Sequence, residues 1–165
     1  MLISLFFFGN PDRGDDAAGE LLYQWASDHF SNQDSVAEGV SLRLISDFQL
    51  EPEHIFDLDG CDLGIFVDSH SASEKSLSWE RIQTGSQLMF SSHSLCPESL
   101  LFLYESTLKK AAPVCYLLGI EGKQYELGTS LSRATQESMM QAKEHLKCRL
   151  KDLQFSPTHS CLESR

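Results

Sequence analysis

Three short segments carry carboxylates and imidazoles that could hold a metal ion. The first follows the apolar run LISLFFF and ends in Asp16, the second follows LGIFV and begins with Asp68, and the third, SSHSLC, contains His93. In sheets of parallel strands, ligands bind beyond the carboxyl ends of the strands, where such segments meet. Carboxylate and imidazole suit a divalent transition metal. Because the segments are far apart in sequence, their convergence depends on the fold.

Each of these residues also has a simpler structural interpretation. Asp15 and Asp16 suit the first turn of a helix, where acids interact favourably with the helix dipole. Asp68 could cap a loop, and His93 taken alone resembles an ordinary loop histidine. Asp68 is the most informative of these residues, because a carboxylate at the end of an apolar strand needs a reason.

Other catalytic chemistries find little support. The segment GNPDRGDD lacks both a G-x-G-x-x-G pattern and a P-loop lysine, and its acids would repel a phosphate. Cys96 lies three residues after His93, but a nucleophilic thiolate needs a base within reach and an electropositive setting, and its neighbours are polar and neutral. The chain has no G-x-S-x-G elbow and no H-E-x-x-H helix. The residues alone therefore indicate a domain with a metal or hydrolytic site.

Strands and helices that alternate along the chain must position these residues. Apolar or alternating patterns predict strands at residues 2–8, 40–45, 63–67 and 114–120. Helical periodicity predicts helices that begin near Asp15, Pro52, Pro97 and Leu131. The segment 77–89 mixes β-like alternation with a break at Gly85. We expect an α/β protein, a single-domain three-layer α/β/α sandwich with a mostly parallel twisted sheet over residues 1–151, and a flexible C-terminal tail at residues 152–165.

Composition narrows the class of protein. The chain has 165 residues and a formal net charge of -11, which argues against nucleic-acid binding. It has five cysteines, an odd number, and no C-x-x-C pair, which argues against a disulfide scaffold and a thiolate zinc site. The apolar start has no basic flank and no cleavage site, and no apolar stretch approaches the roughly 20 residues that span a bilayer. We expect a cytoplasmic protein without a membrane segment.

An ordered series of motifs resembles the nickel–iron hydrogenase maturation endopeptidases. The stretch FFGNPDRGDDAAGELL resembles the opening of that family, in which a strand runs into G-N-x-x-x-x-D-[DE]-x-x-G. The resemblance continues through DFQLEPEHIFDL, IFVDSHSA, SHSLCPESLLFL and CYLLGIEGKQYELGTSLSRAT, and it covers most of residues 1 to about 150. The Q-L-x-P-E version resembles the branch that acts on NAD-linked hydrogenases.

The resemblance implies roles for specific residues. The family's metal-contacting acids correspond to Asp16 and Asp68, and its histidine corresponds to His93. Asp47 corresponds to a further acid near the site that positions the substrate tail or helps in proton transfer. His70 is an extra ligand candidate that could compete with His93. The chain departs from the family at Asp16, which is shorter than the Glu of many relatives, and at a phenylalanine before the first glycine of the motif where a glycine is common.

The resemblance also implies an activity and a partner. The family, whose fold is phosphorylase/hydrolase-like, removes a C-terminal extension from the precursor of the hydrogenase large subunit after nickel insertion. We therefore expect a monomeric protease that recognises nickel supplied by its substrate and needs no organic cofactor. A non-catalytic nickel-binding chaperone that docks on the same subunit is the alternative. A small-molecule hydrolase or phosphorylase and a thiol peptidase are more distant alternatives.

Overall fold

The computed structural model describes residues 1–31, 35–70, 76–85, 90–91 and 94–152. Its central sheet has five strands in the order β2-β1-β3-β7-β4. The strands of this sheet are β1 (Leu2–Phe8), β2 (Ser41–Asp47), β3 (Leu63–His70), β4 (Leu77–Ile82) and β7 (Val114–Glu121). The strands β1, β2, β3 and β7 run parallel, and β4 lies antiparallel to β7 at one edge. The two-residue strands β5 (Phe90–Ser91) and β6 (Ser94–Leu95) pair with each other.

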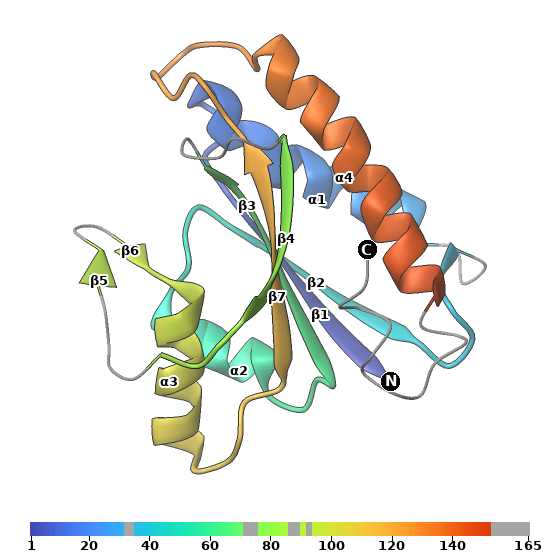
Figure 1. The fold of residues 1–165 in the computed structure, drawn as a ribbon, viewed down its shortest axis with the longest axis vertical. Helices are drawn as coiled ribbons and strands as arrows, with labels where there is room; N and C mark the ends of the chain where they lie inside the picture. The colour runs from blue at the N-terminus through green and yellow to red at the C-terminus, as the bar shows by residue number, and fades with distance from the viewer. Residues whose placement is uncertain (32–34, 71–75, 86–89, 92–93, 153–165) are drawn as a thin grey trace.

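Helices cover both faces of this sheet (Figure 1). The helices α1 (Ala18–His29) and α4 (Arg133–Asp152) lie on one face, and the short α2 (Ile55–Leu58) and α3 (Pro97–Leu108) lie on the other. Two 3-10 turns, η1 (Gly14–Ala17) and η3 (Pro52–His54), lead into α1 and α2. The three-layer α/β/α sandwich predicted from the alternation of strands and helices is confirmed.

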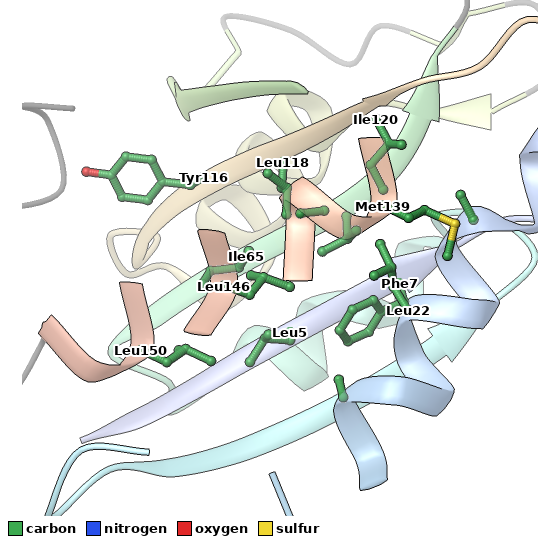
Figure 2. Close-up of a cluster of buried hydrophobic side chains, with 14 of the residues drawn as sticks. Leu5, Phe7, Leu22, Ile65, Tyr116, Leu118, Ile120, Met139, Leu146 and Leu150 are labelled. Carbon is green, nitrogen blue, oxygen red and sulfur yellow. The ribbon is translucent and has the colours of Figure 1, made fainter. Parts of the chain in front are cut away.

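The strand β1 is buried on both faces because almost all its side chains are apolar. Ile3, Leu5 and Phe7 point into the core beneath α1 and α4, while Phe6 and Phe8 point into the core beneath α2 and α3. This alternation is the period of two expected of a strand. Figure 2 shows the first of these cores, where Phe7 and Ile65 of the sheet face Leu22 of α1 and Leu146 of α4.

Aromatic rings fill the core on the α2 and α3 face. The rings of Phe6 and Phe66 stack with centroids 4.9 Å apart, and Phe8 stacks on Phe66 at 6.4 Å. Phe8, the residue directly before Gly9, is 5% exposed and belongs to this core. Its large ring therefore stabilises the end of β1 that leads into the first acidic segment.

The boundaries of the elements refine the predictions. The third strand was expected to end at residue 67, but β3 continues to His70, so Asp68 and His70 belong to the strand and not to the loop after it. Parallel pairing with β7, which extends to Glu121, supports these three extra residues. The ambiguous segment 77–89 contains β4. Apart from its first residue, Asp152, which ends α4, the predicted tail lies outside the described residues.

Two further observations, on membrane segments and on cysteines, apply to the described residues. None of its helices is long and apolar enough to cross a membrane. Its four cysteines, Cys61, Cys96, Cys115 and Cys148, are free thiols.

Candidate functional site

A pocket of about 360 Å³ opens where the parallel strands end. Phe8, Asp47 and His70 are the last residues of β1, β2 and β3, so these strands finish at the same edge of the sheet. The residues that line the pocket are Phe8, Arg13, Asp16, Phe48, Gln49, Leu50, Phe66, Asp68, Ser69, His70, Leu95, Pro97 and Leu117. Two carboxylates, Asp16 and Asp68, thus enter one cavity whose wall is otherwise mostly apolar.

Two close backbone approaches hold Asp16 over the end of β1. A Cβ on Gly9, whose φ is +149°, would lie 1.9 Å from the carbonyl oxygen of Asp16. A Cβ on Gly19 would lie 1.9 Å from the carbonyl oxygen of Phe8, so only glycine allows α1 to approach the strand so closely. The Asp16 carboxylate accepts hydrogen bonds from the Asn10 amide at 3.2 Å and from the Ser69 hydroxyl at 3.4 Å. The motif around Asp16 therefore sets the position of its carboxylate.

Asp15 is a structural residue: it lies in the first turn of η1, as the sequence predicts for a helix-start acid, but its carboxylate also bonds a distant loop. Its carboxylate is fully buried and accepts hydrogen bonds from the amides of Lys123 and Gln124 at 2.7 and 3.0 Å. The amide and the hydroxyl of Ser132 donate two more, at 2.6 and 2.8 Å. Burial raises the pKa of Asp15, but these four donors outweigh burial and hold the pKa below its usual value. Asp15 thus fastens the loop between β7 and α4 to the start of α1 (Figure 1).

Asp68 has the most strongly perturbed carboxyl group of the site. On β3, Phe66, Asp68 and His70 alternate onto the face that lines the pocket. The pKa of Asp68 is raised to about 7, because desolvation raises it most and the charge of Asp16 adds to this, while the hydrogen bond from the Ser69 amide lowers it in part. The Asp68 side chain is exposed by its accessible area, yet protein surrounds it because it stands inside the pocket.

The imidazole of His70 reaches across β7 to contact β4, the second strand away from β3. Its Nε2 lies 3.4 Å from the hydroxyl oxygen of Ser78 on β4. A Cβ on Gly119 of β7, the strand between them, would lie 2.4 Å from each of these two atoms. The missing side chain of Gly119 therefore gives His70 room to reach across β7. His70 lines the same pocket as Asp68, which keeps it a ligand candidate.

Asp47 ends β2 next to the pocket but is not among the residues that line it. Its carboxylate is 3.8 Å from Nε2 of the buried His54, and it accepts the Phe48 amide at 2.7 Å. The other ring nitrogen of His54, Nδ1, lies 2.9 Å from the Glu51 amide that donates to it. This assigns the remaining ring proton to Nε2, which points toward Asp47. The pair fixes the segment that carries Phe48 and Leu50 into the pocket wall.

The third metal ligand predicted from sequence, His93, lies outside the described residues. Among the residues that the structure does describe, no group of three or more His, Cys, Asp or Glu side chains is arranged to hold a metal ion. Asp16 and Asp68 line the same pocket, and their role as metal ligands stays a prediction. Cys96 precedes α3 as its N-cap, and its thiol contacts the Ser99 hydroxyl at 3.2 Å, a structural role for this thiol.

Two features of the pocket were not predicted from the sequence: its apolar wall, and the Ser69 hydroxyl beside Asp16 and Asp68. Phe48 is 65% exposed at the pocket, which is unusual for a large aromatic residue. Its position directly after Asp47, at the end of an alternating strand, was the available signal. Nothing in the local sequence singles out Ser69, because its contact with Asp16 joins residues that are 53 positions apart.

Comparison with known proteins gives matches at the level of structure. No protein-family model matches the sequence, and no curated protein sequence matches it. The structure is similar to that of a NiFe hydrogenase maturation protease from Thermococcus kodakarensis, with a TM-score of 0.65, 19% identity and coverage of 90% of this chain and 91% of that chain. The hydrogenase maturating endopeptidase from Escherichia coli gives a TM-score of 0.67 at 15% identity, over 91% of this chain and 92% of the other.

A third similar structure is a hydrogenase 2 maturation peptidase from a Thaumarchaeota archaeon. It gives a TM-score of 0.61 and 18% identity, over 91% of this chain and 98% of that one. At these identities the likeness establishes a shared fold over nearly the whole length of each chain.

Proposed function

We propose that this protein is an endopeptidase that removes the C-terminal extension of a nickel–iron hydrogenase large-subunit precursor. The observation that carries the proposal is the meeting of Asp16 and Asp68 in one pocket, from segments about 50 residues apart. The fold that forms this pocket is shared with solved hydrogenase maturation proteases. Fold alone does not determine function, and the acid pair adds the chemistry of a site.

The acid pair has the electrostatic properties of a metal-recognition site. With its pKa raised to about 7, Asp68 exchanges its proton near neutral pH, because burial in the pocket disfavours its negative charge and the charge of Asp16 adds to this effect. A divalent cation removes this penalty, since it can bind both carboxylates and displace the proton. The pair is therefore a better site for a cation delivered into the pocket than for any anionic ligand.

The nickel ion in this proposal belongs to the substrate. Nickel held by the precursor would accept oxygen ligands from Asp16 and Asp68, with His93 as the proposed third ligand. This contact fixes the peptide segment beside the site, and proximity of this kind is a large source of rate enhancement. Recognition of the metal also explains why only nickel-loaded precursor would be cleaved.

The apolar wall of the pocket suits the peptide next to the bound nickel. Phe48, Leu50 and Leu117 offer apolar surface within the same cavity as the two acids. We propose that the C-terminal extension lies along this wall, and that Asp47 at its edge positions the tail. The Q-L-x-P-E segment, which includes Leu50, favours precursors of NAD-linked hydrogenases as substrates, and we propose a cytoplasmic location for the protein.

One incubation tests the proposal and separates it from its alternative. Purified protein is mixed with nickel-loaded precursor and with nickel-free precursor, and loss of the C-terminal peptide is followed by mass spectrometry. We expect loss of the peptide from the nickel-loaded precursor alone, and no loss with the Asp68→Ala variant. Binding without cleavage would favour a nickel-binding chaperone, and cleavage by Asp68→Ala at the parental rate would show that Asp68 has another role.

A further inference from the structure

The hydroxyl group of Tyr125 is a buried hydrogen-bond donor that has no role in the proposed function. Tyr125 lies in the loop between β7 and α4, and its hydroxyl makes no hydrogen bond with the residues that the structure describes. Burial raises its pKa, the nearby Ser69 hydroxyl lowers it in part, and the charges of Asp15, Asp16 and Asp68 raise it again. The group is therefore a neutral O–H donor that lies near Ser69 and the acids of the site.

The surrounding backbone holds the Tyr125 ring in this place. A Cβ on Gly122 would lie 2.2 Å from the hydroxyl oxygen of Tyr125 and 3.1 Å from the Cβ of Asp15, so the ring occupies the space of a missing side chain. The amides of Lys123 and Gln124, directly before Tyr125, donate to the Asp15 carboxylate. The carbonyl oxygen of Tyr125 accepts a hydrogen bond from Arg13 at 3.3 Å. Three contacts thus bring this loop against the segment that carries Asp16.

The Ser69 hydroxyl determines which way a hydrogen bond between Ser69 and Tyr125 can run. Asp16 Oδ1 is an acceptor, and the Ser69 hydroxyl donates its proton to it at 3.4 Å. A serine hydroxyl has one proton and two lone pairs, so once Ser69 donates to Asp16 it can only accept from another group. A phenol such as Tyr125 can supply that proton. A buried O–H without a partner is costly, which favours this pairing.

We propose that Tyr125 is a positioning residue whose hydroxyl donates to Ser69, which in turn donates to Asp16 and fixes the direction of its carboxylate. The effect on precursor cleavage rests on the proposed peptidase function, whereas the chain of hydrogen bonds does not. Asp16 and Ser69 line the pocket whereas Tyr125 is not among its lining residues, so Tyr125 acts through Ser69.

A double-mutant cycle tests whether Tyr125 and Ser69 act as a unit. We expect Tyr125→Phe and Ser69→Ala each to lower kcat/KM for nickel-loaded precursor by about five- to ten-fold, the typical net effect of one hydrogen bond. The double variant should be no slower than Ser69→Ala alone, because the first link has no effect once the second is lost. Tyr23→Phe, which removes a hydroxyl from α1, is the matched control. Effects that multiply in the double variant would overturn the proposal.

A second measurement works on the free protein and does not depend on peptidase activity. The carboxyl 13C chemical shift of Asp16 is recorded at one fixed pH in the parent and in each variant. We expect it to move in Tyr125→Phe and in Ser69→Ala and to stay unchanged in Tyr23→Phe. A resonance that does not move in Tyr125→Phe would refute the chain. If the resonance moves but the parent protein cleaves no precursor, the chain stands and the proposed peptidase function fails.

Discussion

Replacing Asp68 with Asn should stabilise the protein at pH 8. Between its usual pKa of 3.8 and about 7, the folded protein holds the Asp68 proton while the unfolded chain has released it. The folded state thus binds more protons in this range, so its stability falls as pH rises from about 4 to about 7. An asparagine has no charge to desolvate, and its oxygen can still accept the Ser69 amide that donates to Asp68 at 2.8 Å.

The size of this effect follows from the shift after a correction for exposure. A shift of about three pKa units corresponds to at most about 4 kcal/mol. Because the Asp68 side chain is exposed to solvent by area, screening reduces this figure, and we expect a gain of about 1 kcal/mol at pH 8. At pH 5 the gain should be smaller, because most of the penalty appears between pH 5 and 7.

Urea denaturation at pH 5 and pH 8 measures this gain. Removal of any negative charge also relieves the self-repulsion of a chain with a net charge of -11. Asp28→Asn, at an exposed position of α1, removes the same charge away from the pocket and is the control. If Asp68→Asn is no more stable than Asp28→Asn at pH 8, or if its advantage does not grow with pH, the burial assigned to the Asp68 carboxyl is wrong. We also expect the variant to lose precursor cleavage, so that stability and activity change in opposite directions.

Three further substitutions test the scaffold and the pocket. Asp15→Asn should lower the free energy of unfolding by about 3 kcal/mol in urea denaturation at pH 7, because it weakens four hydrogen bonds to a buried carboxylate. The pKa of Asp15 is lowered by folding, so the stabilising effect of this carboxylate is present above pH 3.8 and is lost as the pH falls below that value. Gly19→Ala should lower the stability by about 3 kcal/mol or prevent folding, because the new Cβ would lie 1.9 Å from a carbonyl oxygen of β1. Gly60→Ala is the control: Gly60 has open space around it and a φ of +77°, so this substitution should lower the stability by only about 1 kcal/mol. Thermal denaturation compares the two variants. Phe48→Ala should raise KM for nickel-loaded precursor about five-fold without a change in stability, and Phe56→Ala, equally 65% exposed but on α2, should leave KM unchanged in the same assay. Equal KM values for these two variants would exclude the apolar wall as a contact for the peptide.

The sequence by itself determined the class of fold and the edge of the sheet at which the candidate site lies. The apolar run of β1 could only be a strand covered on both faces, and the helical spacing after Asp15 required α1 to follow it. Such periodicities are local, because each depends on which side of one element meets the core. Because ligands bind beyond the carboxyl ends of parallel strands, the sequence also predicts that Asp16 and Asp68 lie at the same edge of the sheet.

Only the tertiary structure decided what each acid does. Asp15 and Asp16 are adjacent in sequence and chemically identical, yet one is fully buried by donors from the loop before α4 and the other lines the pocket. Likewise Asp47 faces His54, while Asp68 faces the pocket. The partners that separate these roles lie up to 117 positions away, as with Asp15 and Ser132. Burial and charge at a carboxylate depend on such distant neighbours, and no local pattern in the sequence records them.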